Sequence, residues 1–104
     1  MNRTVINKDT LFKIQNIHEL SRKYNMRLGY NHTSRLLSLM QEHVKEIQEL
    51  HTKGDSHCVT ETGDLIMLCF ELLIDKSASI NEVMDRCFER YNTKLSKLLQ
   101  EVNR

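Results

Sequence analysis

Residues 59–75, VTETGDLIMLCFELLID, contain the longest apolar run of the chain and decide its fold class. Leu65, Leu68 and Leu72 recur at three- and four-residue steps, the spacing that places side chains on one face of an α-helix. The polar residues that begin at Asp75 interrupt this pattern. The segment therefore predicts an amphipathic helix whose apolar face packs against other helices.

The same spacing recurs on both sides of this segment and predicts three more helices. Each follows a side chain that can accept a hydrogen bond from the first helical turn. Together, the expected helices span residues 10–26, 34–53, 59–75 and 80–102. The candidate caps are Asp9 or Thr10 for the first helix, Asn31 or Thr33 for the second and Ser79 for the fourth. Ser79 and Glu82 form a capping box.

The composition favours a single all-α domain over residues 1–104. The chain is 39% hydrophobic and 28% charged, with no Pro and 3 Gly, so it has residues for one core and few for turns. Short connections make a four-helix bundle-like assembly the simplest architecture. Such a core is thin, and the last helix has more apolar positions than one bundle face needs. We therefore expect a homodimer or homotetramer.

Charge and cysteine content exclude several classes of protein. The 15 basic and 14 acidic residues give a net charge of +1, so we expect neither nucleic acid nor a membrane as a partner. The 3 Cys form no C-x-x-C motif, and a disulfide framework is not expected. The first residues resemble no signal peptide, and the run Leu65–Phe70 is too short to span a membrane. A cytoplasmic protein is predicted.

Two pairs of carboxylates lie on the helices expected at 34–53 and 59–75. Glu46 and Glu49 are three residues apart, as are Glu61 and Asp64, so each pair covers one turn on one helix face. The short connection makes the two helices antiparallel neighbours, so the pairs can converge. Carboxylates are the ligands that Mg²⁺ and Mn²⁺ prefer. The spacing predicts a divalent-cation site at these four residues.

Glu61 distinguishes this site from ordinary surface pairs. Its angle around the helix is about that of Leu68 and Leu72, so its carboxylate points at the interior. A buried carboxylate is costly unless it is paired or bound to a metal, and we expect positive charge beside it. Pairs with this spacing are also common on solvated faces, where Glu42 extends the strip. The inward position of Glu61 favours the cation site.

At these residues the chain resembles a known family. The segments VKEIQEL at 44–50 and ETGDLIMLCFELL at 61–73 are similar to the MazG-type all-α nucleoside triphosphate pyrophosphohydrolases. That family is marked by E-x-x-E, a gap and then E-x-x-D. The resemblance covers roughly residues 36–98.

The resemblance implies an oligomeric enzyme that hydrolyses a (d)NTP to the (d)NMP and pyrophosphate. It implies Mg²⁺, or Mn²⁺ in its place, bound through Glu46, Glu49, Glu61 and Asp64. In such a site the metal activates a water, and a carboxylate that is not fully engaged accepts its proton. RYNTKLSK at 90–97 resembles the family's triphosphate-binding motif. Its matching residues are Asn92, Lys94 and Lys97.

Two alternatives were compared with this interpretation. His43, His51, His57 and Cys58 lie near one turn, but H-x₅-H-C is not a zinc-binding spacing, so we interpret them as ordinary polar residues. His51 is the exception, because it lies on the apolar side of its helix and is expected to be a core or interface histidine. The second alternative is a non-enzymatic helical interaction or regulatory protein. Its acidic pairs are solvated faces, and its last helix binds a partner. Release of pyrophosphate from a panel of nucleotides separates the two functions.

Overall fold

The computed structural model describes residues 5–103, which form four α-helices and no strand. The helices are α1 (Lys8–Arg27), α2 (His32–Thr52), α3 (Cys58–Asp75) and α4 (Ile80–Val102). The predicted all-α class is confirmed, and each helix begins and ends within two residues of its predicted bounds. The connections between the helices are short, as expected.

The helix caps follow the sequence with one exception. Asn31 caps α2 and Ser79 caps α4, as predicted. The prediction of Asp9 or Thr10 as the first cap is wrong, because the Asn7 side chain accepts a hydrogen bond from the Thr10 backbone N–H at 2.8 Å. Asp9 instead lies in the first turn, where a carboxylate stabilises the positive end of the helix dipole.

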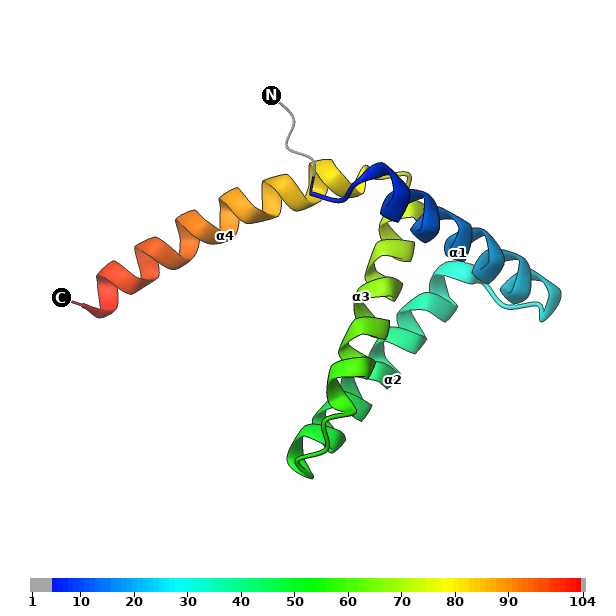
Figure 1. The fold of residues 1–104 in the computed structure, drawn as a ribbon, viewed down its shortest axis with the longest axis horizontal. Coiled ribbons are helices and arrows are strands. Elements are labelled where there is room, and N and C mark those ends of the chain that lie inside the picture. Colours follow the sequence, from blue (N-terminus) through cyan, green and yellow to red (C-terminus); the bar gives the residue numbers. More distant parts are fainter. Residues whose placement is uncertain (1–4, 104) are drawn as a thin grey trace.

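Helices α2 and α3 lie side by side and antiparallel, α1 crosses one end of this pair, and α4 extends away from it (Figure 1). The radius of gyration is 16.8 Å. A compact domain of this length has about 13 Å. The difference arises because α4 contacts the rest of the chain only near its start (Figure 1). The protein is a three-helix unit with one projecting helix.

The apolar core of this unit is small. The buried apolar side chains among residues 5–103 are Ile14, Leu36, Leu68 and Ile80, one from each helix. Leu36 of α2 is 0% exposed. An equal number of polar side chains is also buried: His18, Asn25, Glu61 and Glu71. Polar contacts therefore have a large part in holding the helices together.

Polar side chains also fix the ends of the helices. Asn81, at the start of α4, accepts hydrogen bonds from the N–H groups of Val5 and Ile6 at 3.1 and 2.8 Å. It also donates one to the Ile6 carbonyl at 3.2 Å. The Thr33 hydroxyl donates to the Asp75 carboxylate, which joins the start of α2 to the end of α3. Both sets of contacts lie near the C-terminal end of α3.

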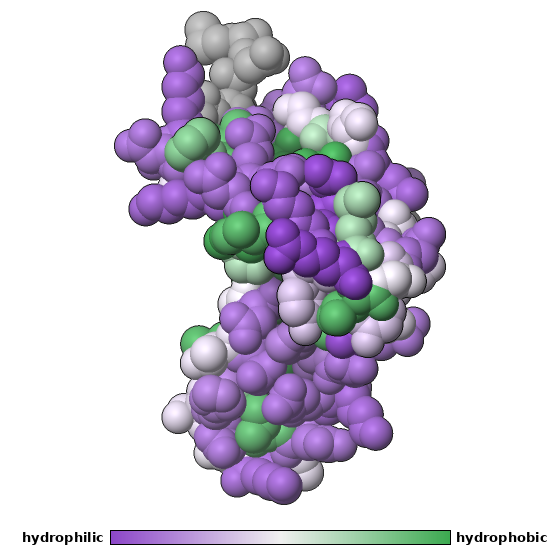
Figure 2. Space-filling model, turned by 90° about the vertical axis from the view of Figure 1, so that its right-hand side faces the viewer, coloured by the Kyte–Doolittle hydropathy of each residue, from purple (hydrophilic) through white to green (hydrophobic). Residues whose placement is uncertain are grey.

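The surface differs between the two sides of the molecule. The face in Figure 2, opposite the side toward which α4 extends, is mostly hydrophilic, with hydrophobic residues in small separate patches. By contrast, α4 exposes several large apolar side chains: Phe88, Tyr91, Leu95, Leu98, Leu99 and Val102. None of the helices within residues 5–103 has both the length and the apolar character that crossing a membrane requires.

The cysteines behave as the sequence predicts. Cys58, Cys69 and Cys87 are free thiols, and each is half-buried. Burial raises the pKa of the Cys69 thiol above its ordinary value. A raised pKa leaves less of the reactive thiolate at neutral pH, so Cys69 packs as a small apolar side chain.

We expect Leu36→Ala to lower the free energy of unfolding by about 2–5 kcal/mol, because it empties a fully buried site in a small core. Leu37→Ala is the matched control, since Leu37 follows it on the same helix and is 45% exposed. Urea unfolding monitored by circular dichroism measures both variants. Equal losses in the two would contradict the core described here.

Candidate functional site

Glu61 is the centre of the candidate site, between α2 and α3. The residue is 9% exposed, which confirms that its carboxylate points inward. Its Oε2 lies 2.6 Å from Nδ1 of His43 on α2, and its Oε1 lies 3.5 Å from Nε2 of His57. Both imidazoles carry a positive charge only when protonated. They stand where the sequence predicted positive charge.

The local structure explains how these side chains meet. Glu61 lies in the first turn of α3, where the unpaired N–H groups of the helix favour a carboxylate. His57 precedes it by four residues, one turn earlier at the start of the helix. His43 comes from the neighbouring helix, so its contact with Glu61 joins α2 to α3.

The structure brings two of the four predicted metal ligands together. Glu46 and Glu61, with His43, place three ligand atoms within 4.8 Å of one another. Residues 5–103 contain two groups of three side chains that could hold a metal ion, and neither group includes Glu49 or Asp64. Both of these side chains are exposed, as is Glu42. Glu49 follows Glu46 by one turn and Asp64 follows Glu61 by one turn, so both border the group.

His43 is the residue that the sequence interpretation missed. From the sequence alone it is interpreted as an ordinary polar residue, together with His57, because the histidines lack a zinc-binding spacing. The structure instead pairs both with Glu61, from two different segments of the chain. One signal was present, since His43 precedes Glu46 by three residues and so shares its helix face. His51 is exposed and belongs to neither metal-capable group of the described residues.

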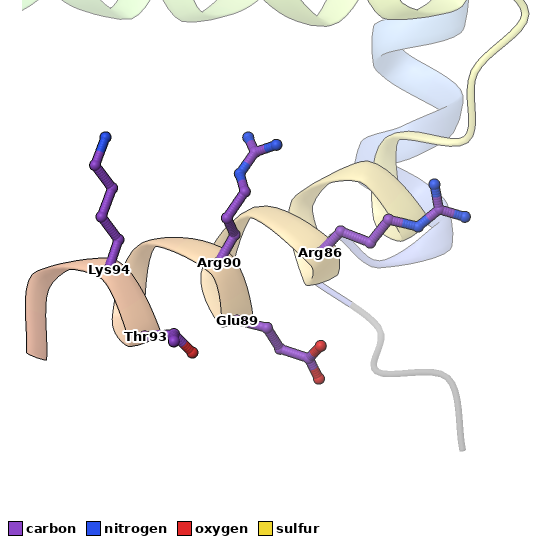
Figure 3. A pocket seen from close by; sticks show the side chains of 5 residues that line it. All are labelled: Arg86, Glu89, Arg90, Thr93 and Lys94. Carbon is purple, nitrogen blue, oxygen red and sulfur yellow. The ribbon is translucent and has the colours of Figure 1, made fainter. Parts of the chain in front are cut away.

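The predicted triphosphate-binding residues lie on α4. Asn92, Lys94 and Lys97 are all exposed. Lys94 lines a shallow hollow with Arg86, Glu89, Arg90 and Thr93. Figure 3 shows Arg90 and Lys94 extending toward the same side of the helix. Arg86, Arg90 and Lys94 are spaced by four residues, which places three cationic groups in a row along α4.

Comparisons with known proteins identify no relative. No family model matches the chain, and no curated protein or solved structure matches it significantly. The chemistry of the site therefore has to be inferred from its residues. Carboxylate oxygens from two facing helices suit a hard divalent cation. The imidazole of His43 lies beside them and contacts the Glu61 carboxylate.

Proposed function

We propose that the chain is a Mg²⁺-dependent nucleoside triphosphate pyrophosphohydrolase, with Mn²⁺ as an alternative ion. The observation that carries this proposal is the carboxylate of Glu61, buried between α2 and α3 and grouped with Glu46. These residues belong to an E-x-x-E and an E-x-x-D motif on antiparallel neighbouring helices. The motifs resemble those of the MazG-type family. Because (d)NTPs are cytoplasmic metabolites, we place the protein in the cytoplasm.

The donor atoms support a divalent cation at this site. Glu46 and Glu61 are the residues that would hold it, and Glu49 and Asp64 would complete the set from the next turn of each helix. The ion pairs of Glu61 within residues 5–103 are with histidines only, whose positive charge is lost on deprotonation. A divalent cation carries a permanent charge, so it compensates the buried carboxylate of Glu61 whether or not the histidines are protonated. Such an ion would offset part of the charge of the triphosphate and would lower the pKa of a water at the site.

The chain's own residues then supply the proton transfer. Hydrolysis forms a bond from the water oxygen to phosphorus and breaks the P–O bond between the α and β phosphates, with pyrophosphate as the leaving group. One carboxylate of the set accepts the proton that the water loses. Asp64 suits this role because it is exposed and lies one turn from Glu61. No protein nucleophile is needed.

Cationic and amide groups on α4 are proposed to bind the triphosphate. Lys94 is the main candidate, with Asn92 and Lys97 beside it, because Lys94 belongs to the cationic row that includes Arg90. Hydrogen bonds from charged donors to phosphate oxygens are strong. Glu61 lies in the first turn of α3, whereas α4 follows its last turn and extends away (Figure 1). The Lys94 side chain therefore reaches a carboxylate site most directly on a neighbouring copy.

This geometry supports a homodimer or homotetramer. The apolar side chains of Tyr91, Leu95 and Leu99 on α4 are 56%, 59% and 61% exposed. A contiguous apolar helix face that no other part of residues 5–103 covers is typical of a protein–protein interface. Assembly through α4 buries these side chains and brings the cationic row toward the partner's carboxylates.

The second candidate is a non-enzymatic helical interaction or regulatory protein. The exposed apolar face of α4 favours it, since an amphipathic helix presents such a face to a partner of another kind. The two functions differ in one measurement. The absence of Mg²⁺- or Mn²⁺-dependent pyrophosphate release from canonical and modified (d)NTPs, including dUTP, dCTP and phosphoribosyl-ATP, supports the second.

Glu61→Gln and Asp64→Asn are expected to lower kcat by about 100-fold or more, because each removes a carboxylate charge from the cation site. Asp64→Asn keeps or raises the free energy of unfolding without metal, since it relieves repelling charges. Glu101→Gln, a change of an exposed carboxylate on α4, is the control and keeps full activity. Pyrophosphate release with Mg²⁺ or with a chelator is the measurement. A fully active Asp64→Asn variant contradicts the site.

Lys94→Ala should lower kcat/KM for the triphosphate by about 10-fold, equivalent to about 1.4 kcal/mol of transition-state binding. The Mg²⁺ affinity should stay unchanged, because Lys94 binds phosphate and no metal. Lys13→Ala, an exposed change on α1, is the control. Steady-state kinetics and calorimetric Mg²⁺ titration test the two statements. An unaltered kcat/KM removes Lys94 from the binding site.

Leu95→Asp is expected to shift the protein from an oligomer to a monomer near 12.3 kDa, because the charge lies within the proposed apolar interface. Ser96→Asp adds the same charge at the next exposed position and serves as the control. Light scattering after size-exclusion chromatography gives the mass of each. A monomeric wild-type protein at micromolar concentration contradicts assembly through α4.

A further inference from the structure

A second group of ligand-type side chains lies apart from the candidate active site. His18 of α1, His32 of α2 and Glu71 of α3 place three ligand atoms within 4.8 Å of one another. Glu71 follows Glu61 by ten residues, which separates the two groups by about 15 Å along α3. This second group therefore joins all three helices of the packed unit at the opposite end of α3.

The atoms that face one another in this group are buried and have no hydrogen-bond partner. They are Nδ1 of His18, Nε2 of His32 and Oε1 of Glu71. His18 is 8% exposed and Glu71 is 5% exposed. The His18 Nδ1 to Glu71 Oε1 distance is 3.6 Å, which is too long for a hydrogen bond. Buried polar atoms are nearly always satisfied, so three that converge on one point indicate a missing shared partner.

We propose that these three side chains bind a Zn²⁺ ion. Two imidazole nitrogens and one carboxylate oxygen form a typical zinc ligand set, whereas Mg²⁺ and Ca²⁺ prefer oxygen ligands alone. Tetrahedral zinc with ligands at about 2.0–2.2 Å sets them about 3.4 Å apart. The 3.6 Å between His18 and Glu71 is close to that separation without any ion.

Asn25 supplies the outer contact that such a site needs. Its amide nitrogen lies 2.9 Å from Nδ1 of His32, and the side chain is 3% exposed. A histidine that binds a metal through one ring nitrogen usually donates a hydrogen bond from the other. The two ends of an amide have the same shape, so turning Asn25 over presents its oxygen to Nδ1–H of His32. The lone pair of Nε2 is then directed at the zinc position.

The ion would act as a cross-link between α1 and the α2–α3 pair. Its binding favours the folded state, because the three ligands converge only there. This role does not depend on the proposed hydrolase activity, since its ligands and those of the Mg²⁺ site share no residue. An ion pair between protonated histidine and Glu71, without any metal, is the competing arrangement.

Zinc titration of the full chain after treatment with a chelator tests the proposal. We expect calorimetry to give one Zn²⁺ per chain and an increase in melting temperature on binding. His32→Gln is the main variant because His32 is only half-buried, and it should weaken binding at least 100-fold. Glu71→Gln should weaken binding at least 10-fold. His51→Gln and His43→Gln are the controls and should bind as the wild type does.

The outcomes that overturn the zinc site are distinct. The absence of Zn²⁺ binding by the wild type assigns the group to a plain ion pair. If the wild type and His32→Gln bind Zn²⁺ equally well, the ion lies elsewhere. If His43→Gln loses Zn²⁺ binding, the ion belongs to the Glu61 site. Co²⁺ in place of zinc should give the absorption of a four-coordinate ion with nitrogen and oxygen ligands. A thiolate-to-cobalt band assigns the ion to cysteine and also rejects the proposal.

Discussion

The packing of α1, α2 and α3 buries two carboxylates of α3 beside histidines of the neighbouring helices. Glu61 and Glu71 lie on α3 and are among the most buried side chains of the described chain. A buried carboxylate requires a positive partner, and here each faces histidine: His43 and His57 at one end, His18 at the other. The fold therefore depends on histidine partners, which are cationic only when protonated, or on cations that replace them.

The sequence predicts most of this fold because its helices are defined locally. Apolar spacing locates all four, and Asn31 and Ser79 mark two of their starts. The inward position of Glu61 also follows from helical geometry alone. The contacts between His43 and Glu61, and among His18, His32 and Glu71, join different helices. Helical periodicity gives the direction of a side chain but not the residue of another helix that it meets. Neither the His43–Glu61 contact nor the group of His18, His32 and Glu71 can therefore be predicted from periodicity.

The last helix shows a related limit. Its apolar stripe is as regular as those of α2 and α3, yet Leu95 and Leu99 remain exposed. An amphipathic pattern shows that a face is to be covered, but not whether its own chain or another molecule covers it. Because α4 holds Lys94 and extends away from the carboxylates, the proposed substrate binding would depend on the proposed assembly.

Because half of the buried side chains are polar, bound cations would contribute to the stability of this fold. Within residues 5–103, the buried side chains include four apolar residues and four that are polar or ionisable. A core of this size contributes little stability by itself, and small domains commonly rely on metals or assembly. Cations that bind only the folded state add stability by mass action. A hard ion at Glu46 and Glu61 and a zinc ion at His18, His32 and Glu71 would bind independently, because the two proposed sites share no ligand. The two ends of α3 would then stabilise the same fold through ions of different chemistry.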